Sequence, residues 1–175
     1  MDESEYQRRR GAVRESLARS HSVWGYASQR AGRVMSSWLL DVADRLVIAA
    51  GDDRILFHET FGGGEDGKEP GADVRVVAFS ATRRIELRTA VPLANAGAAV
   101  TVAVKGRRGL LQADLLSFEA RGGAATFPLG VSLRLRYADG DELTLGTYTG
   151  GEGDWDAPFT LAEQYAGLLD DLARP

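Results

Sequence analysis

Cysteine is absent from this 175-residue sequence, and histidine occurs only twice, at His21 and His58. The absence of cysteine excludes disulfides, thiolate metal ligands and cysteine nucleophiles. Two histidines leave little material for general-base catalysis or metal binding. No apolar run reaches the roughly 18 to 20 residues of a membrane span, and the N-terminus lacks the apolar segment of a secretory signal. We therefore expect a cytoplasmic protein with no metal and no cofactor.

Motifs for catalysis and nucleotide binding are also missing. Residues 62–67 match GxGxxG, but Pro70 follows almost directly, where the motif needs a helix whose free amides hold pyrophosphate. No GxSxG sequence accompanies the serines. His58 falls in an expected strand, and we interpret it as a surface or rim residue. We predict no enzyme activity and assign no catalytic residue.

Charge is distributed unevenly along the chain, whose formal net charge is -4. Residues 1–34 hold seven arginines and four acidic residues, whereas the rest of the chain has an excess of acidic residues. A negatively charged body repels phosphates, so we expect no nucleic-acid binding by it. The basic N-terminal segment is left as a candidate arm for an acidic partner or membrane surface.

The N-terminal segment, residues 3–44, has the periodicity of a helix. Its apolar residues recur at spacings of three or four, at Trp24, Ala27, Ala31, Val34, Trp38 and Val42. Gly25 and Gly32 each cost about 1 kcal/mol relative to alanine in a helix interior. We therefore expect a break or bend near residues 21–25. Residues 1–43 are assigned as an N-terminal helical extension.

Two interpretations of this apolar stripe stay open. In the first, it packs on the protein's own sheet, because most helices gain their stability from such packing. In the second, it is a docking surface for a partner or a membrane, or for a second copy in a homodimer. The candidate docking residues are Trp24, Arg30, Arg33, Val34 and Trp38.

From residue 44 onward the periodicity is that of strands. Alternating runs bounded by glycine, proline or asparagine predict strands over Arg45–Ala50, Arg54–Phe61, Val74–Phe79, Arg84–Val91, Ala99–Lys105, Leu110–Glu119, Val131–Tyr137 and Glu142–Leu145. Gly51 to Asp53 predicts a turn between the first two strands, and Asp139–Gly140 predicts one between the last two. Many short strands at this spacing favour a barrel or sandwich.

A single helix is expected at the C-terminus. Thr160 and Glu163 form the S/T-x-x-E capping box that satisfies free amides at a helix start. An apolar face then follows at helical spacing, made of Leu161, Tyr165, Leu168, Leu169 and Leu172. We expect this helix to pack back onto the β domain.

This order of elements resembles the pleckstrin-homology-like (PH-like) superfold as found in bacterial PH-like domains. The similarity lies in alternation and turns over Val76–Leu87 (VVAFSATRRIEL), Leu115–Glu119 and Ser132–Gly146. It implies an α+β, mainly β fold over residues 44–175, a bent antiparallel barrel of about seven or eight strands closed by the C-terminal helix. It also implies binding of lipid headgroups, peptides or proteins, although a fold does not define a function. The first hairpin turn, where phosphoinositide-binding members carry basic residues, is Gly51 to Asp53 here.

Positive charge in the body is concentrated in one expected turn, Lys105, Gly106, Arg107, Arg108 and Gly109. The glycines let backbone amides as well as side chains face an anion. Arg83 and Arg84, in another expected turn, are candidate additions to this site. The structural alternative is a solvated turn.

The sequence thus predicts a non-enzymatic adaptor that recruits a protein partner or docks at an acidic membrane surface. Two other hypotheses stay open. One is a small-molecule carrier or enzyme whose cavity lies between barrel and N-terminal helix, lined by Trp24, Trp38 and Tyr137. The other is a structural homo-oligomer that assembles through the N-terminal stripe.

Overall fold

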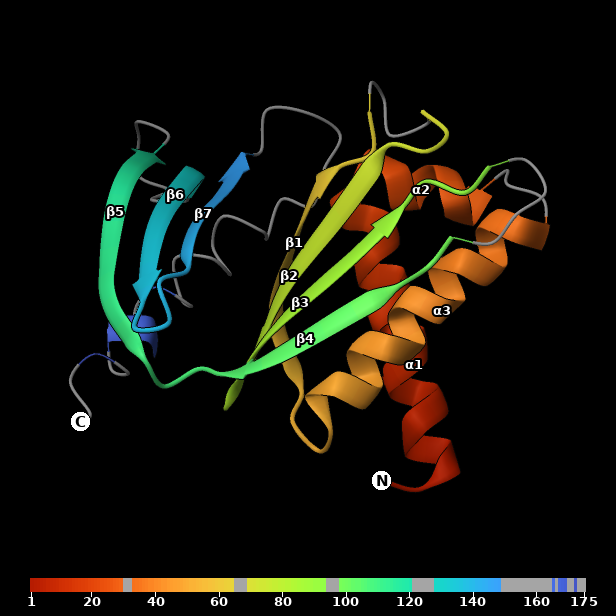
Figure 1. Ribbon diagram of the computed structural model, residues 1–175, viewed down its shortest axis with the longest axis horizontal. Helices are drawn as coiled ribbons and strands as arrows, with labels where there is room; N and C mark the ends of the chain where they lie inside the picture. Colours follow the sequence, from red (N-terminus) through yellow and green to blue (C-terminus); the bar gives the residue numbers. More distant parts are fainter. Residues whose placement is uncertain are drawn as a thin grey trace. The chain divides into compact units, whose positions relative to one another are not determined.

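The computed structural model describes residues 1–29, 33–64, 69–93, 98–120, 128–148, 165, 167–169 and 172. The chain divides into two compact units, residues 1–105 (unit 1) and residues 106–175 (unit 2). Unit 1 contains three helices and a four-stranded sheet, and unit 2 contains a three-stranded sheet (Figure 1). The α+β class with antiparallel sheets is therefore confirmed. The described strands form two separate sheets and no closed barrel.

The N-terminal segment forms three helices, α1 (Glu3–Ser20), α2 (Ser22–Gln29) and α3 (Arg33–Ala50). Asp2 caps α1, because its side chain accepts a hydrogen bond from the Glu5 amide at 2.8 Å. The helix ends at His21, whose backbone is extended (φ -154°, ψ 143°). The predicted break near residues 21–25 is confirmed.

The strand predicted over Arg45–Ala50 is wrong, because α3 continues to Ala50. Leu46, Val47 and Ala50 are buried while Ile48 is 64% exposed, which is the spacing of a helix face. A short apolar run fits either period, so the sequence alone misassigned it. Gly51, with φ +64°, donates its amide to the Val47 carbonyl and ends the helix. The predicted hairpin turn is therefore a helix end, and the predicted boundary at residue 43 lies inside α3.

The sheet of unit 1 has the order β1 (Ile55–Gly62), β2 (Asp73–Ser80), β3 (Arg83–Ala90) and β4 (Thr101–Gly106). β2 pairs antiparallel with β1 and with β3, so that Val76 lies between Thr60 and Leu87. The three helices cover one face of this sheet (Figure 1). The strands predicted over residues 54–61, 74–79 and 84–91 agree with β1, β2 and β3.

The core of unit 1 lies between the helices and this face of the sheet. Trp24 of α2 and Trp38 of α3 meet at its centre, with ring centroids 4.6 Å apart. Each indole Nε1 donates a hydrogen bond to a threonine of the sheet, to Thr60 at 2.8 Å and to Thr89 at 3.0 Å. The N-terminal stripe is therefore part of the protein's own core, as the first interpretation predicted.

Unit 2 contains the sheet β5 (Leu110–Ala120), β6 (Pro128–Tyr137) and β7 (Glu142–Tyr148), in that order. The β6–β7 hairpin confirms the prediction, and its turn contains Gly140 with φ +85°. Its inward side chains, Leu133, Leu135, Leu143 and Leu145, are buried.

The end of the chain is described only at residues 165, 167–169 and 172, which are helical. Leu168 is buried there, whereas Leu169 is exposed. The predicted capping box, Thr160 and Glu163, lies outside the described residues. Unit 2 is thus described as a sheet with helical residues near the C-terminus.

Candidate functional site: a groove between the three helices

The predicted basic turn is only partly available to a ligand. Lys105 is half-buried at the end of β4, in unit 1. In unit 2, Arg107 is 6% exposed whereas Arg108 lies on the surface. The Arg107 guanidinium lies beside Gly167, one of the helical residues near the C-terminus. A Cβ atom placed on this glycine would be 3.2 Å from Arg107 Nη2. Arg107 therefore contributes to the packing of unit 2.

Arg83 and Arg84 belong to unit 1 and serve its structure. Arg83 Nη1 donates a hydrogen bond to the Ala49 carbonyl at 2.7 Å, at the C-terminal end of α3. A cation at the C-terminal end of a helix donates to free carbonyls and interacts favourably with the helix dipole. Arg84 is 2% exposed. The four candidate arginines are thus divided between the two units, and only Arg108 and part of Arg83 are open to solvent.

The residues of the predicted docking helix are also mostly inside. Trp24 and Trp38 are buried, and Val34 is half-buried. Arg33 begins α3, and Arg30 lies outside the described residues. Neither tryptophan can meet a partner or line a ligand cavity, since both are packed in the core of unit 1. Tyr137, the third predicted cavity residue, is buried in unit 2.

Helix α1 carries five arginines, and three of them are held by the protein itself. Arg8 pairs with Glu5 at 2.7 Å within the helix. Arg9 donates to the carbonyls of Gly51, at 2.6 Å, and Asp53. Arg10 pairs with Asp44 of α3 at 2.7 Å.

Asp44 also accepts a hydrogen bond from Tyr6 Oη at 2.5 Å. This bond to the carboxylate favours the neutral phenol and raises the pKa of Tyr6. Tyr6, Arg10 and Asp44 therefore join α1 to α3 through a small polar cluster. The charges of Arg10 and Asp44 are therefore paired with each other and stabilise the contact between the two helices.

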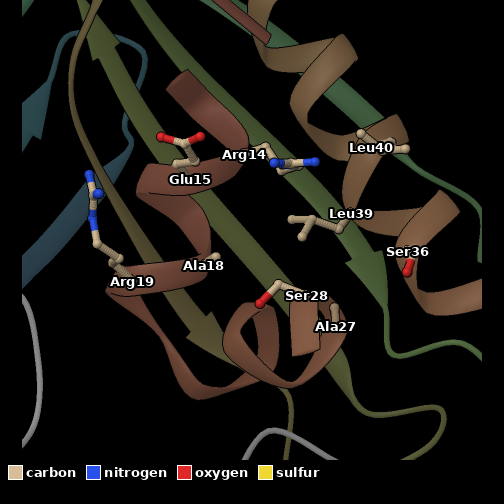
Figure 2. Close-up of a pocket in the computed structure, with 9 residues that line it drawn as sticks. All are labelled: Arg14, Glu15, Ala18, Arg19, Ala27, Ser28, Ser36, Leu39 and Leu40. Atoms are coloured by element: carbon tan, nitrogen blue, oxygen red, sulfur yellow. The ribbon is translucent and has the colours of Figure 1, made fainter. Parts of the chain in front are cut away.

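The other two α1 arginines, Arg14 and Arg19, form no ion pair or hydrogen bond with the described part of the chain. Both line a cavity of about 470 Å³ between the three helices, which we call the three-helix groove. Its remaining lining residues are Glu15, Ala18, Ala27, Ser28, Ser36, Leu39 and Leu40 (Figure 2). Two exposed arginines and one exposed glutamate are therefore among the residues that line this groove.

The local sequence explains how the groove forms. On α1, Val13 and Leu17 turn toward the core, which leaves Arg14 and Ala18 on another face of the helix. Ala18 of α1 and Ala27 of α2 have short side chains, and both line the groove. In Figure 2 the Arg14 side chain extends toward Leu39 and Leu40 of α3, and Arg19 lies at the opposite edge. The groove thus combines positive charge, hydroxyl groups and an apolar wall.

His58 is half-buried, with Nε2 2.7 Å from Ser16 Oγ, and this contact joins β1 to α1. A serine hydrogen-bonded to a histidine meets one requirement of nucleophilic catalysis. That chemistry also needs amide donors for a developing oxyanion. Ser16 lies in the interior of α1, where the backbone amides are already bonded within the helix. We assign this pair to the contact between α1 and the sheet.

Two other kinds of site are missing from the described residues. No three histidine, aspartate or glutamate side chains among them gather to hold a metal ion. None of the described helices is both long enough and apolar enough to cross a membrane. Compared with protein-family models, curated proteins and solved structures, the chain gives no match.

Proposed function

We propose that this protein is a non-enzymatic binding module of the cytoplasm that recruits a protein partner through the three-helix groove. One observation carries the proposal. Arg14 and Arg19, the two α1 arginines without a partner in the described part of the chain, both line this groove. Arg9 and Arg10, which stabilise the fold, bond to residues outside α1. Arginines that remain available in a cavity are suited to an acidic ligand.

The size and charge of the groove support this proposal. A volume of about 470 Å³ falls within the roughly 300–1,000 Å³ of sites that hold small ligands or a few side chains. The chain as a whole is negatively charged, so a locally positive groove gives an approaching acidic segment one preferred place to bind.

Docking at an acidic membrane surface has less support. A helix that lies on a membrane inserts an apolar face between lipids. The apolar stripe with Trp24 and Trp38 is instead buried in the core. Pelleting of the protein with vesicles rich in phosphatidylserine, and its loss in an Arg107/Arg108→Ala variant, would favour the membrane alternative.

We further propose that the fold is PH-like. Four consecutive strands in one sheet, three in the next and helical residues after them are consistent with a barrel closed by a helix. An experimental structure in which the helix near residue 168 fills one open end of a bent barrel would support this proposal. A structure in which the two sheets do not share one core would contradict it.

Photo-crosslinking in the cells that express the protein tests the binding site. We would place benzoylphenylalanine at Leu40, which lines the groove, and at the exposed Ile48 of the same helix as a matched control. The expected result is a discrete protein adduct from position 40, severalfold stronger than from position 48. The adduct should be lost when Arg14→Gln and Arg19→Gln are combined. Equal adducts from the two positions, or an adduct that survives both substitutions, would contradict the proposal.

A further inference from the structure

The chemistry of the groove suggests what kind of segment it binds. We infer that it recognises a short peptide segment of the partner in which one acidic residue adjoins an apolar residue. The carboxylate would pair with Arg14, and the apolar side chain would pack on Leu40 and Ala18. This inference rests on the proposed function and specifies the ligand of the same site.

The carboxylate position follows from the polar side chains. The guanidinium of Arg14 extends over the groove in Figure 2, and a guanidinium offers two parallel donors that match a carboxylate. Ser28, whose hydroxyl donates to the Gly25 carbonyl at 2.9 Å, and Ser36 lie on the facing helices α2 and α3. Ser36 also lies in the first turn of α3, which begins at Arg33, and the positive end of a helix dipole favours an anion.

The number of charges favours a single carboxylate over a doubly charged phosphate. Arg14 and Arg19 bring two positive charges to the groove, and Glu15 brings one negative charge. One carboxylate balances this excess. A second negative charge would remain unbalanced and would be repelled by Glu15.

The apolar position follows from the rest of the lining. Ala18 on α1 and Leu40 on α3 are partly exposed apolar residues of the lining, whereas Ala27 and Leu39 are buried in the core. An apolar side chain placed here leaves water and gains packing on Ala18 and Leu40. A purely acidic segment would not use these two residues.

Fluorescence anisotropy with the full chain tests the inference. The probe is a labelled peptide, Gly-Ser-Asp-Leu-Leu-Gly-Ser, compared with versions that carry asparagine or phosphoserine for the aspartate, or two serines for the leucines. We expect asparagine to weaken binding about tenfold, since an arginine pair with a carboxylate is charge-assisted. The serine version should also bind more weakly, and phosphoserine should not bind more tightly than aspartate.

Protein variants complete this test. Arg14→Gln should weaken the aspartate probe about tenfold, because it removes the charge-assisted bond. Arg8→Gln removes an arginine of the same helix that is paired with Glu5 outside the groove, and should leave binding unchanged. Circular dichroism would confirm that both variants fold.

Equal binding of the aspartate and asparagine probes, or equal effects of Arg14→Gln and Arg8→Gln, would overturn the inference. The two proposals fail in different ways. If no peptide binds but the adduct from position 40 persists, the groove recruits a protein by other chemistry and only the inference is wrong. If both experiments are negative, the proposed function is wrong as well.

Discussion

Trp24 and Trp38 hold the helices on the sheet through single polar atoms. A buried indole N–H needs an acceptor, and Thr60 on β1 and Thr89 on β3 supply the two acceptors. The rings also contact each other at the centre of the core. Each tryptophan therefore provides apolar area and one directional bond, which orients its helix relative to one strand.

A Trp24→Phe substitution tests the bond from Trp24 to Thr60. It removes the indole donor, leaves the Thr60 hydroxyl buried and creates a small cavity, so we expect a loss of about 1 to 3 kcal/mol in the free energy of unfolding. Urea denaturation followed by circular dichroism measures it. Thr60→Val is the matched variant, and the double variant should be less destabilised than the sum of the two. Strict additivity would show that the bond contributes nothing.

Glu86 shows a different use of charge at the residue scale. Burial would raise the pKa of its carboxyl, but hydrogen bonds from Arg75, at 2.9 Å, and Arg88, at 2.7 Å, lower the pKa overall. The charged groups of Glu86, Arg75 and Arg88 therefore pair with one another within the sheet. Arg14 and Arg19 have no such partner in the described chain, and this contrast marks them as candidates for function.

At the scale of elements, His21 separates α1 from α2. It ends the first helix in an extended conformation, and its Nδ1 accepts a hydrogen bond from the Val23 amide at 3.3 Å, in the first turn of α2. Burial lowers the pKa of His21, because it disfavours the charged ring. The neutral imidazole is therefore the form that supports both helix ends.

This lowered pKa predicts how stability depends on pH. Below the unfolded-state pKa of about 6.5, the unfolded chain binds a proton that the folded chain resists. The contribution of His21 to stability should therefore be complete above about pH 7 and should fall as pH is lowered through and below 6.5. Urea denaturation over about pH 5 to 8 measures this dependence.

His21→Asn is the control for this prediction. Asparagine can accept the same amide hydrogen bond but does not titrate. The variant should keep its stability at neutral pH and show a weaker loss at low pH than the natural protein. Parallel pH profiles for the two proteins would show that His21 is not the titrating group.

The junction between α3 and β1 shows how distant side chains complete an element. Arg9 and Arg83 donate to carbonyls of Gly51 and Ala49. Asp53 accepts hydrogen bonds from Thr82, through its hydroxyl at 2.5 Å and its amide at 3.1 Å, and from Ser80. These bonds lower the pKa of Asp53, and they tie the start of β1 to the β2–β3 turn.

At the scale of the whole molecule, stability should differ between the strands of each sheet. In unit 1, β2 is paired on both sides and lies under the helices, whereas β4 is an edge strand with exposed residues. In unit 2, β6 is the central strand. Backbone amides exchange their hydrogen most slowly where exchange requires unfolding of the core.

Hydrogen exchange with mass spectrometry tests this order. We expect amides of β2 and β6 to exchange most slowly within their own units, and amides of β4 and the first turn of α1 to exchange fastest among the regular elements. Faster exchange in β2 than in β4 would contradict the packing of the helices on the sheet.

Local patterns in the sequence were sufficient for most elements. The periods of 3.6 and 2 residues predicted the helical start of the chain, the strands over residues 54–61, 74–79 and 84–91, and the hairpin at Asp139–Gly140. These periods can be read from residues that are close together in the sequence. The run over residues 45–50 was misassigned because its five apolar residues fit both periods, and only packing with the core selected the helix.

The tertiary structure decided which charges are available. Arg9, Arg10 and Arg83 look like any other arginine in the sequence, but each finds a partner 34 or more residues away along the chain. Arg14 and Arg19 find none within the described chain, and the groove between the helices exists only once α1, α2 and α3 pack together. The sequence by itself determined most of the elements and the absence of catalytic motifs. The location of the candidate site depended on contacts between distant residues, which no local pattern records.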